Sequence, residues 1–307
     1  MIENPQKTIK DIIELEGVGL HCGMKVNLVL KPAEPNTGIK FKRIDLHENN
    51  IIEANYKNVK APILCTRIEN SYGVSVSTIE HLMASFYGEG IDNVLIEIDA
   101  PEVPIMDGSA FDFVEAIRSY GTQNQKYSKK FIKVLKKVEI KDGAKQISIE
   151  PLNKDLIIDF EIVYKNQLIR TRRKEFKLSN GDLTSIYNSR TFCLYEDIDK
   201  IRSQGLAKGG SLENAIVVSE NKILNDDGLR YRDEFVSHKI LDCLGDLMLA
   251  EHRIYGHIKT SQGGHLLTNA LLKEFLLNKS NWEFENFDGK KEDLKDTNYP
   301  SPFAASA

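Results

Sequence analysis

Residues 235–248, FVSHKILDCLGDLM, have the periodicity of an amphipathic α-helix. Because a helix advances by about 100° per residue, side chains three or four positions apart share a face. The apolar and polar residues of this stretch separate in that way, so we expect one face to pack and the other to hold polar chemistry. The apolar face comprises Val236, Ile240, Leu244 and Leu247, and the polar face comprises His238, Lys239, Asp242 and Asp246.

His238 and Asp242 are four residues apart on that polar face. Side chains at this spacing lie about 5–6 Å apart at Cβ, close enough for both to bind one small ion. The alternative is a helix face that is simply solvated. The stretch taken alone leaves both interpretations open.

A second amphipathic helix is predicted from about residue 77 to Gly88 or Gly90. His81 lies roughly opposite its apolar face, so this imidazole is either exposed or binds something. Glu80 follows Ser77 by three residues, the spacing of a capping box in which the glutamate only caps the helix. The apolar face comprises Ile79, Leu82, Met83 and Phe86.

A third imidazole, His265, follows two glycines, which permit close approach of the backbone to a ligand. A solvated loop histidine is the alternative. His81, His238 and Asp242 together supply three ligands and leave a fourth tetrahedral position to water, which is typical of a catalytic zinc. Such a site also needs a carboxylate that takes a proton and a cation that stabilises an oxyanion. The side chains suited to these two roles are Glu80 and His265.

Strand-like and helical runs alternate along the rest of the chain. They predict an α+β fold of two similar sheet-plus-helix layers rather than a parallel doubly wound sheet. A polar, aperiodic segment at 119–130 predicts a boundary between domains at 1–125 and 126–280, followed by a loosely held polar tail at 281–307. Strands are predicted at 25–30, 94–98, 131–140, 146–149 and 156–164, a helix after Ser109, a helix–turn–strand unit at 198–218, and helices at 233–250 and 265–278.

Composition narrows the class of protein. The 307 residues suffice for about two domains, and 41 Lys and Arg against 45 Asp and Glu make a nucleic-acid partner unexpected. None of the four cysteines forms a C-x-x-C pair, which favours a reducing compartment. There is no signal-peptide pattern and no run of ~18 apolar residues. We therefore expect a cytoplasmic protein without stable membrane insertion.

Seven separated motifs extend this interpretation. They are GVGLHCG (17–23), EHL (80–82), GIDN (90–93), PIMDGSA (104–110), SRTF (189–192), GGS (209–211) and FVSHKILD (235–242). With these motifs the sequence, from residue 6 to about residue 277, resembles the zinc-dependent UDP-3-O-acyl-N-acetylglucosamine deacetylases, which act early in lipid A synthesis.

The resemblance implies two similar α+β domains with the active site in the cleft between them. It implies one catalytic Zn²⁺ per chain on His81, His238 and Asp242. Fe²⁺ would suit two imidazoles and a carboxylate as well. It also implies that Glu80 is the general base and that His265 is the cation facing the oxyanion and the leaving amine.

Further residues take roles by the same resemblance. Asp246 would orient His265 and keep it charged. Thr191 would donate a hydrogen bond to the oxyanion, and Phe192 would pack against the sugar nucleotide. Lys239 would pair with a substrate phosphate or hydroxyl, the alternative being a solvated flank.

In this family a β-α-β insert of the second domain forms an apolar passage for the 3-O-acyl chain, and it maps near residues 193–218. Core packing would explain most of its apolar residues equally well. The candidates for the passage wall are Leu194, Ile198, Ile201, Leu206, Ala207, Ala215 and Val217.

The implied reaction removes the N-acetyl group of UDP-3-O-acyl-N-acetylglucosamine and gives UDP-3-O-acyl-glucosamine and acetate. The partner is then a small acylated UDP-amino-sugar, and we expect a monomer. A zinc amidohydrolase acting on another N-acetyl sugar is one alternative, although the apolar insert argues against a fully water-soluble substrate. A non-catalytic binding protein of the same fold is the other, although every residue expected to do chemistry is present.

Overall fold

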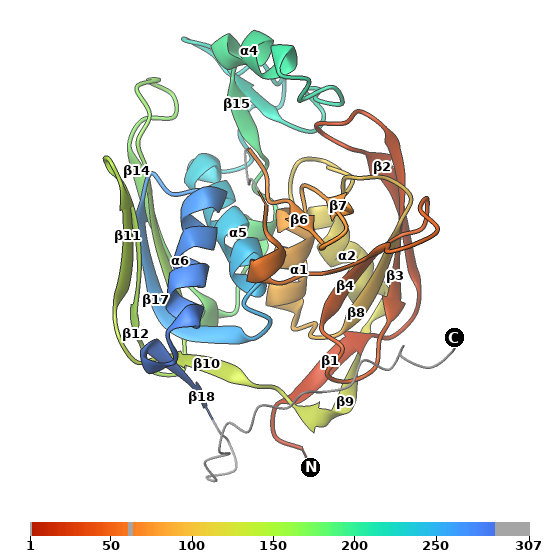
Figure 1. Ribbon diagram of the computed structural model, residues 1–307. Coiled ribbons are helices and arrows are strands. Elements are labelled where there is room, and N and C mark those ends of the chain that lie inside the picture. The colour runs from red at the N-terminus through yellow and green to blue at the C-terminus, as the bar shows by residue number, and fades with distance from the viewer. Residues whose placement is uncertain (1, 61–63, 286–307) are drawn as a thin grey trace.

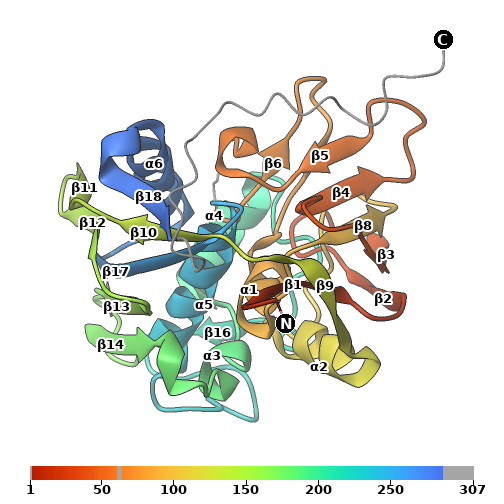
Figure 2. The ribbon, with the colours of Figure 1, turned by 90° about the horizontal axis from the view of Figure 1, so that it is seen from below.

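Two sheets enclose a layer of helices, as Figures 1 and 2 show from two directions. The computed structural model describes residues 2–60 and 64–285. Helices α1 (Glu80–Glu89) and α2 (Phe111–Tyr120) lie beside the sheet of the first half, and α5 (Glu234–Met248) and α6 (His265–Leu277) beside that of the second. The predicted α+β class of sheet-plus-helix layers is therefore confirmed.

Strands of the first sheet alternate between buried and more exposed residues. In β3 (Lys25–Pro32), Val26, Leu28 and Leu30 are fully buried, so one face packs and the other meets solvent. All neighbouring pairs are antiparallel except β4 with β8. The order of the five described strands is β2 (Ile13–Val18), β3, β8 (Val94–Ile98), β4 (Ile39–Arg43) and β5 (Ile51–Glu53).

The second sheet is built around β17 (Arg253–Ser261). This strand runs antiparallel to β12 (Lys145–Pro151) and parallel to both β13 (Leu156–Ile162) and β10 (Phe131–Val134). The run predicted at 131–140 thus divides into two strands. The outer members are β11 (Val138–Asp142) beside β12, β14 (Arg172–Lys177) beside β13, and β18 (Trp282–Glu285) beside β10.

The segment predicted to be aperiodic, 119–130, contains a strand. Here β9 (Thr122–Ser128) pairs antiparallel with β1 (Pro5–Ile9). Six of its seven residues are exposed, so the strand is held by backbone hydrogen bonds and has no apolar periodicity that a sequence could display. The predicted domain boundary near residue 125 falls within it.

A strand also begins inside the predicted polar tail. Trp282 opens β18, is buried, and donates a hydrogen bond from Nε1 to the Leu276 carbonyl at 3.2 Å. Residues 282–285 therefore belong to the second sheet. The rest of that tail, 286–307, lies outside the described residues.

Helices follow the predictions closely where the pattern was strong. Both α5 and α6 end within two residues of the predicted limits. The predicted capping box is wrong, because α1 begins at Glu80 and its N-cap residue is Ile79. Ser77 therefore lies outside the helix.

In the described part of the chain no helix combines the length and apolarity needed to cross a membrane. The shorter elements are α3 (Thr184–Tyr187), α4 (Ile198–Ser203), the 3₁₀ turns at Tyr56–Asn58, Leu178–Asn180, Tyr195–Asp197 and Lys279–Asn281, and the strand pairs β6 (Ile68–Glu69) with β7 (Ser75–Val76) and β15 (Phe192–Leu194) with β16 (Ile216–Val218).

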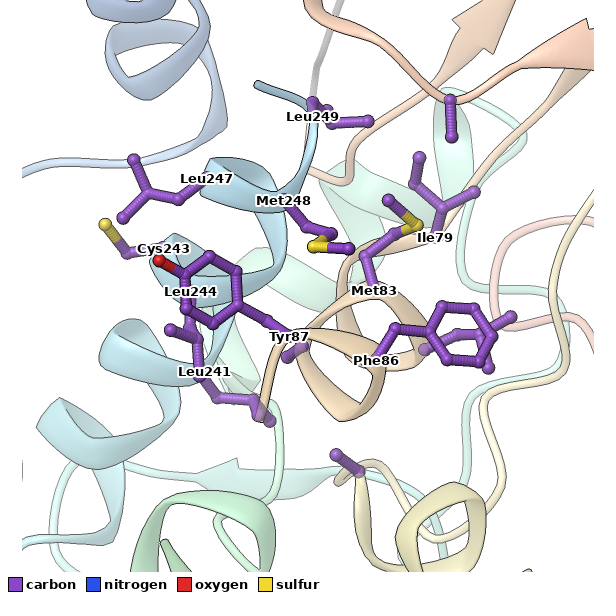
Figure 3. Packing of buried hydrophobic residues seen from close by; sticks show 14 of the residues in the cluster. Ile79, Met83, Phe86, Tyr87, Leu241, Cys243, Leu244, Leu247, Met248 and Leu249 are labelled. Atoms are coloured by element: carbon purple, nitrogen blue, oxygen red, sulfur yellow. The ribbon is translucent and has the colours of Figure 1, made fainter. Parts of the chain in front are cut away.

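The contact between α1 and α5 joins the two halves (Figure 3). Met83 and Tyr87 of α1 and Leu244 and Met248 of α5 are buried in the core. Near the start of α1 the helices approach so closely that a Cβ on Gly245 would lie 2.0 Å from the Glu80 carbonyl oxygen. Only glycine fits there, and the close approach brings residues of α1 beside the polar residues of α5.

Candidate metal centre

His81, His238 and Asp242 form a group that could hold a metal ion, because their ligand atoms lie within 4.8 Å of one another. His81 comes from α1 and the other two from α5. None of the three is more than 4% exposed, so the polar residues of α5 are not a solvated helix face. The α1–α5 contact creates the group from residues about 160 positions apart in sequence.

The spacing of these atoms fits a tetrahedral ion. His81 Nε2 and His238 Nε2 each lie 3.4 Å from Asp242 Oδ1. With bonds of about 2.0–2.1 Å, a tetrahedral zinc places neighbouring ligand atoms about 3.3–3.4 Å apart. The donor set of two imidazoles and one carboxylate also leaves one position open.

The protonation states of His238 and Asp242 also favour metal binding. His238 Nδ1 donates to the Ser189 carbonyl at 3.0 Å, which leaves Nε2 as the nitrogen with a free lone pair. Burial lowers the pKa of His238 to about 3, so the imidazole is neutral. Burial opposes charge on Asp242 too, but the Lys239 ammonium, which donates a hydrogen bond to its Oδ2, holds the pKa of Asp242 well below its usual range. A neutral imidazole and an ionised carboxylate are the forms that bind metal.

Glu80 and His265 lie directly beside this group. Glu80 Oε1 is 3.6 Å and Asp242 Oδ2 is 3.9 Å from His265 Nε2, and the three side chains form a second possible ligand group that shares Asp242. Glu80 Oε2 accepts a hydrogen bond from the Thr66 N–H at 2.9 Å instead of capping a helix. His265 is the first residue of α6 and only 8% exposed, so it is not a solvated loop residue.

Glu80 and His265 differ in how tightly each holds a proton. Burial raises the pKa of Glu80 above its usual range, which strengthens this carboxylate as a base. Burial disfavours charge on His265, but the carboxylates of Asp246 and Glu80 outweigh it and raise the pKa of His265 to about 10. His265 Nδ1 donates to Asp246 Oδ2 at 2.9 Å. A buried base thus faces a buried cation.

Thr66, which no sequence motif singles out, contacts several of these side chains. Besides holding Glu80, its hydroxyl donates to Asp246 Oδ1 at 2.5 Å and lies 3.0 Å from His265 Nδ1. Thr66 lies just before the two-residue strand β6, where no helical or strand periodicity marks it. Nothing short of the assembled fold identifies it.

The SRTF motif lies along one side of the metal group. The Phe192 ring centroid is 6.2 Å from that of His238, and Lys239 Nζ lies 5.6 Å from the Phe192 ring centroid. Lys239 is partly buried and donates to Asp242 Oδ2 at 2.9 Å, so it is not a solvated flank. The backbone N–H of Thr191 donates to the Gly108 carbonyl at 2.7 Å, which ties the motif to the first half.

Residues 193–218 contain the predicted helix–turn–strand unit. Its helix is α4 and its strand is β16, which runs parallel to the preceding β15, and the resulting β-α-β arrangement projects from the body of the molecule in Figure 1. The Gly209 N–H donates to the Leu20 carbonyl at 3.0 Å, so the unit also contacts the first half. The wall candidates Leu194, Ile198, Ile201, Leu206 and Ala207 are partly buried, and Ala215 and Val217 are buried.

Two imidazoles and a carboxylate that could hold a metal ion, beside a further carboxylate and imidazole, are the kinds of group that a metal-dependent hydrolase uses. The family model described as UDP-3-O-acyl N-acetylglycosamine deacetylase matches residues 6–277, and the chain belongs to this family. The expected family is therefore confirmed.

Individual relatives of the chain bear the name of the same family. The chain is 45% identical to the UDP-3-O-acyl-N-acetylglucosamine deacetylase of Pasteurella multocida (strain Pm70), covering 93% of this chain and 94% of the relative. It is 44% identical to the enzyme of that name from Haemophilus influenzae (strain 86-028NP), over 94% of this chain and 95% of the relative. The corresponding Shewanella pealeana enzyme is 43% identical over 98% of this chain and 97% of its own length.

Proposed function

We propose that this chain removes the N-acetyl group from UDP-3-O-acyl-N-acetylglucosamine, a step of lipid A biosynthesis, at the site formed by α1, α5 and α6. The observation that carries the proposal is the convergence of a possible metal-ligand group with a buried base and a buried cation. The family and its named relatives support the same reaction. The products are UDP-3-O-acyl-glucosamine and acetate.

The proposed metal ligands are His81, His238 and Asp242, which together would hold one ion per chain. Zn²⁺ is the proposed ion because the atom spacing suits it, and Fe²⁺ suits the same donors. When bound, the metal supplies Lewis acidity that lowers the pKa of a water and polarises the acetyl carbonyl. All proposed site residues come from one chain, and we propose that it acts as a monomer.

Glu80 is the proposed general base. Its Oε2 is held by the Thr66 N–H, so Oε1 is the oxygen available to take a proton from the attacking water. The water oxygen bonds to the acetyl carbon, and the carbon–nitrogen bond then breaks. His265 carries a proton at Nε2, 3.6 Å from Glu80 Oε1, and delivers it to the departing glucosamine nitrogen.

The remaining residues of the proposed site bind and orient the substrate. The Thr191 hydroxyl donates to the oxyanion of the tetrahedral adduct, and the charge of His265 stabilises the same oxygen. Phe192, beside His238, packs against the sugar nucleotide. Lys239 extends over the Phe192 ring and pairs with a phosphate or hydroxyl of the substrate.

The experiment that tests this function measures acetate release from the acylated sugar nucleotide together with metal content. Dipicolinate should abolish acetate release and Zn²⁺ should restore it. Full activity in metal-free protein, or no acetate release by the zinc-loaded protein, would contradict the proposal.

Comparing substrates separates this function from that of an amidohydrolase acting on other N-acetyl sugars. If residues 193–218 form a passage for the acyl chain, each buried methylene adds up to ~0.8 kcal/mol of binding. kcat/KM should therefore rise with acyl length and then level off or fall. Replacing Ala215 by Phe should move the optimum to shorter chains, because the larger side chain would narrow the passage. A flat dependence on acyl length in the unmodified chain would favour the alternative substrate class.

A further inference from the structure

Thr66 lies where the three helices of the site meet. Its N–H contacts Glu80 of α1, and its hydroxyl contacts Asp246 of α5 and His265 of α6. Its carbonyl accepts from the Ile79 N–H at 3.4 Å, which fixes the residue to the start of α1. Thr66 is 2% exposed, and its N–H and its hydroxyl are both bonded to side chains of the protein.

The hydrogen bonds around the hydroxyl have a single consistent direction. A hydroxyl has one hydrogen to donate, and a carboxylate can only accept. Thr66 Oγ1 lies 2.5 Å from Asp246 Oδ1 and must donate there. At 3.0 Å from His265 Nδ1 the same oxygen is then an acceptor. The Nδ1–H is shared between Thr66 Oγ1 and Asp246 Oδ2, and the three groups form a closed ring.

This ring determines which atoms face the reaction. With Nδ1 held by two acceptors, the imidazole of His265 presents Nε2 to Glu80 Oε1. The Thr66 N–H occupies the other oxygen of Glu80. Thr66 thus contacts His265, the proposed acid, at Nδ1 and also fixes Glu80, the proposed base.

We propose that Thr66 is a positioning residue of the deacetylation reaction, which sets the carboxylate of Glu80 and the imidazole of His265 in a fixed relation for proton transfer. The inference rests on the proposed function. Thr66 acts through these two side chains and contributes no contact to the substrate.

Two substitutions separate the hydroxyl from the shape of the side chain. Thr66→Val keeps the backbone N–H and the branched shape but removes the hydroxyl, and Thr66→Ser keeps the hydroxyl. Losing the outer hydrogen-bonding partner of a metal-ligating residue typically costs 10–100-fold in metal affinity or activity. Thr66 supports Glu80 and His265 in a comparable way, so kcat of Thr66→Val should fall by about that factor. KM and metal content should remain near those of the wild type, and Thr66→Ser should retain most of kcat. Thr66→Ala carries the same expectation as Thr66→Val if the valine variant folds poorly.

Thr268→Val is the matched control. Thr268 is also 2% exposed and lies on α6, but its hydroxyl donates to the Gly264 carbonyl instead of a proposed catalytic group. Its loss should leave kcat close to that of the wild type. Melting temperatures of all variants separate lost stability from lost alignment.

A spectroscopic measurement tests Thr66 independently of turnover. In the zinc-loaded protein the Nδ1–H of His265 should give a proton NMR signal protected from exchange with water, and Thr66→Val should shift it and speed its exchange. An unchanged kcat together with an unchanged Nδ1–H signal in Thr66→Val would overturn the inference, as would a Thr66→Ser variant that loses as much kcat as the valine variant. If the wild-type chain releases no acetate, the proposed function fails, and the NMR comparison still decides the role of Thr66.

Discussion

Glu80 is a buried carboxylate whose role can be tested by removing its charge alone. Glu80→Gln should reduce turnover by about 10²–10⁴-fold, the usual contribution of a general base. Metal content should stay near that of the wild type, because the proposed ligands are His81, His238 and Asp242. Acetate release and metal analysis on one preparation measure both quantities.

Glu89→Gln provides the control for that variant. Glu89 lies on the same helix, where it forms an ion pair of 2.8 Å with Arg118 away from the metal group. Its substitution should leave turnover unchanged. Retained turnover in Glu80→Gln would show that the carboxylate serves the fold instead of the reaction.

Asp246 controls the charge of His265 and therefore the alkaline side of the pH profile. Burial opposes the charge, yet Asp246 and Glu80 raise the pKa of His265 to about 10. Activity that needs the charged imidazole is present below that pKa and is lost as the pH rises through it. Asp246→Asn removes a carboxylate, lowers the pKa of His265, and should shift the alkaline limb of kcat to lower pH.

The control for this shift is Asp142→Asn, an exposed carboxylate at the end of β11. It should leave the alkaline limb in place. A limb that stays at its wild-type position in Asp246→Asn would mean that His265 does not set it.

At the residue scale, the sequence predicts what helical spacing can encode. His238 and Asp242 share a helix face because they are four residues apart, and the structure confirms their proximity. The capping-box interpretation of Glu80 is wrong because tertiary contacts shift the helix start, and the carboxylate instead bonds to Thr66. Thr66 itself lies in irregular structure, where no local pattern connects a residue to three distant helices.

Gly245 is the residue on which the α1–α5 contact depends. In an isolated helix alanine is more favourable than glycine by about 1 kcal/mol. At this position, however, a Cβ would lie 2.0 Å from the Glu80 carbonyl oxygen. Relieving such a backbone contact separates the helices, and overpacking of this kind costs about 1–3 kcal/mol. Gly245→Ala should therefore lower both the melting temperature and the metal content, because His81 moves away from Asp242.

Gly210→Ala is the comparison, since the nearest atom to its Cβ would be the Ala207 carbonyl oxygen at 3.4 Å. This variant should keep its melting temperature and metal content. A Gly245→Ala protein that binds metal as the wild type does would show that the helices can separate without disturbing the ligands.

Elements differ in how far the sequence predicts them. The amphipathic helix α5 and the alternating strand β3 bury one set of side chains, and that burial leaves a period in the sequence. In contrast, β9 is exposed along nearly its whole length, and β18 is short. The sequence of β9 carries no period because the strand is held by pairing with β1. The apolar–polar alternation in β18 spans only four residues, too few to predict a strand.

The whole molecule brings together residues that the chain keeps far apart. Glu80 and His81 come from the first half, and His238, Asp242 and His265 from the second. Each half alone presents an incomplete set. Local patterns in the sequence suggested the residue types, and only the resemblance to a known family implied that the halves meet, because that meeting depends on the packing of α1 against α5.

A metal ion held by His81 from one half and by His238 and Asp242 from the other would link the two halves directly. An ion that binds only the folded chain stabilises it by about 2.7 kcal/mol at a free concentration of 100 Kd. We therefore expect chelation to lower the melting temperature by several degrees and Zn²⁺ to restore it. In His81→Ala the change in melting temperature should be small, because the ligand from the first half is missing. In the control His47→Ala, which replaces an exposed histidine, the change should persist. Melting temperatures of the chelated and zinc-loaded forms measure the effect. Equal melting temperatures for the two forms of the wild-type chain, with zinc bound in one of them, would contradict a bridge between the halves, since an ion that binds the folded chain more tightly than the unfolded one must raise its stability.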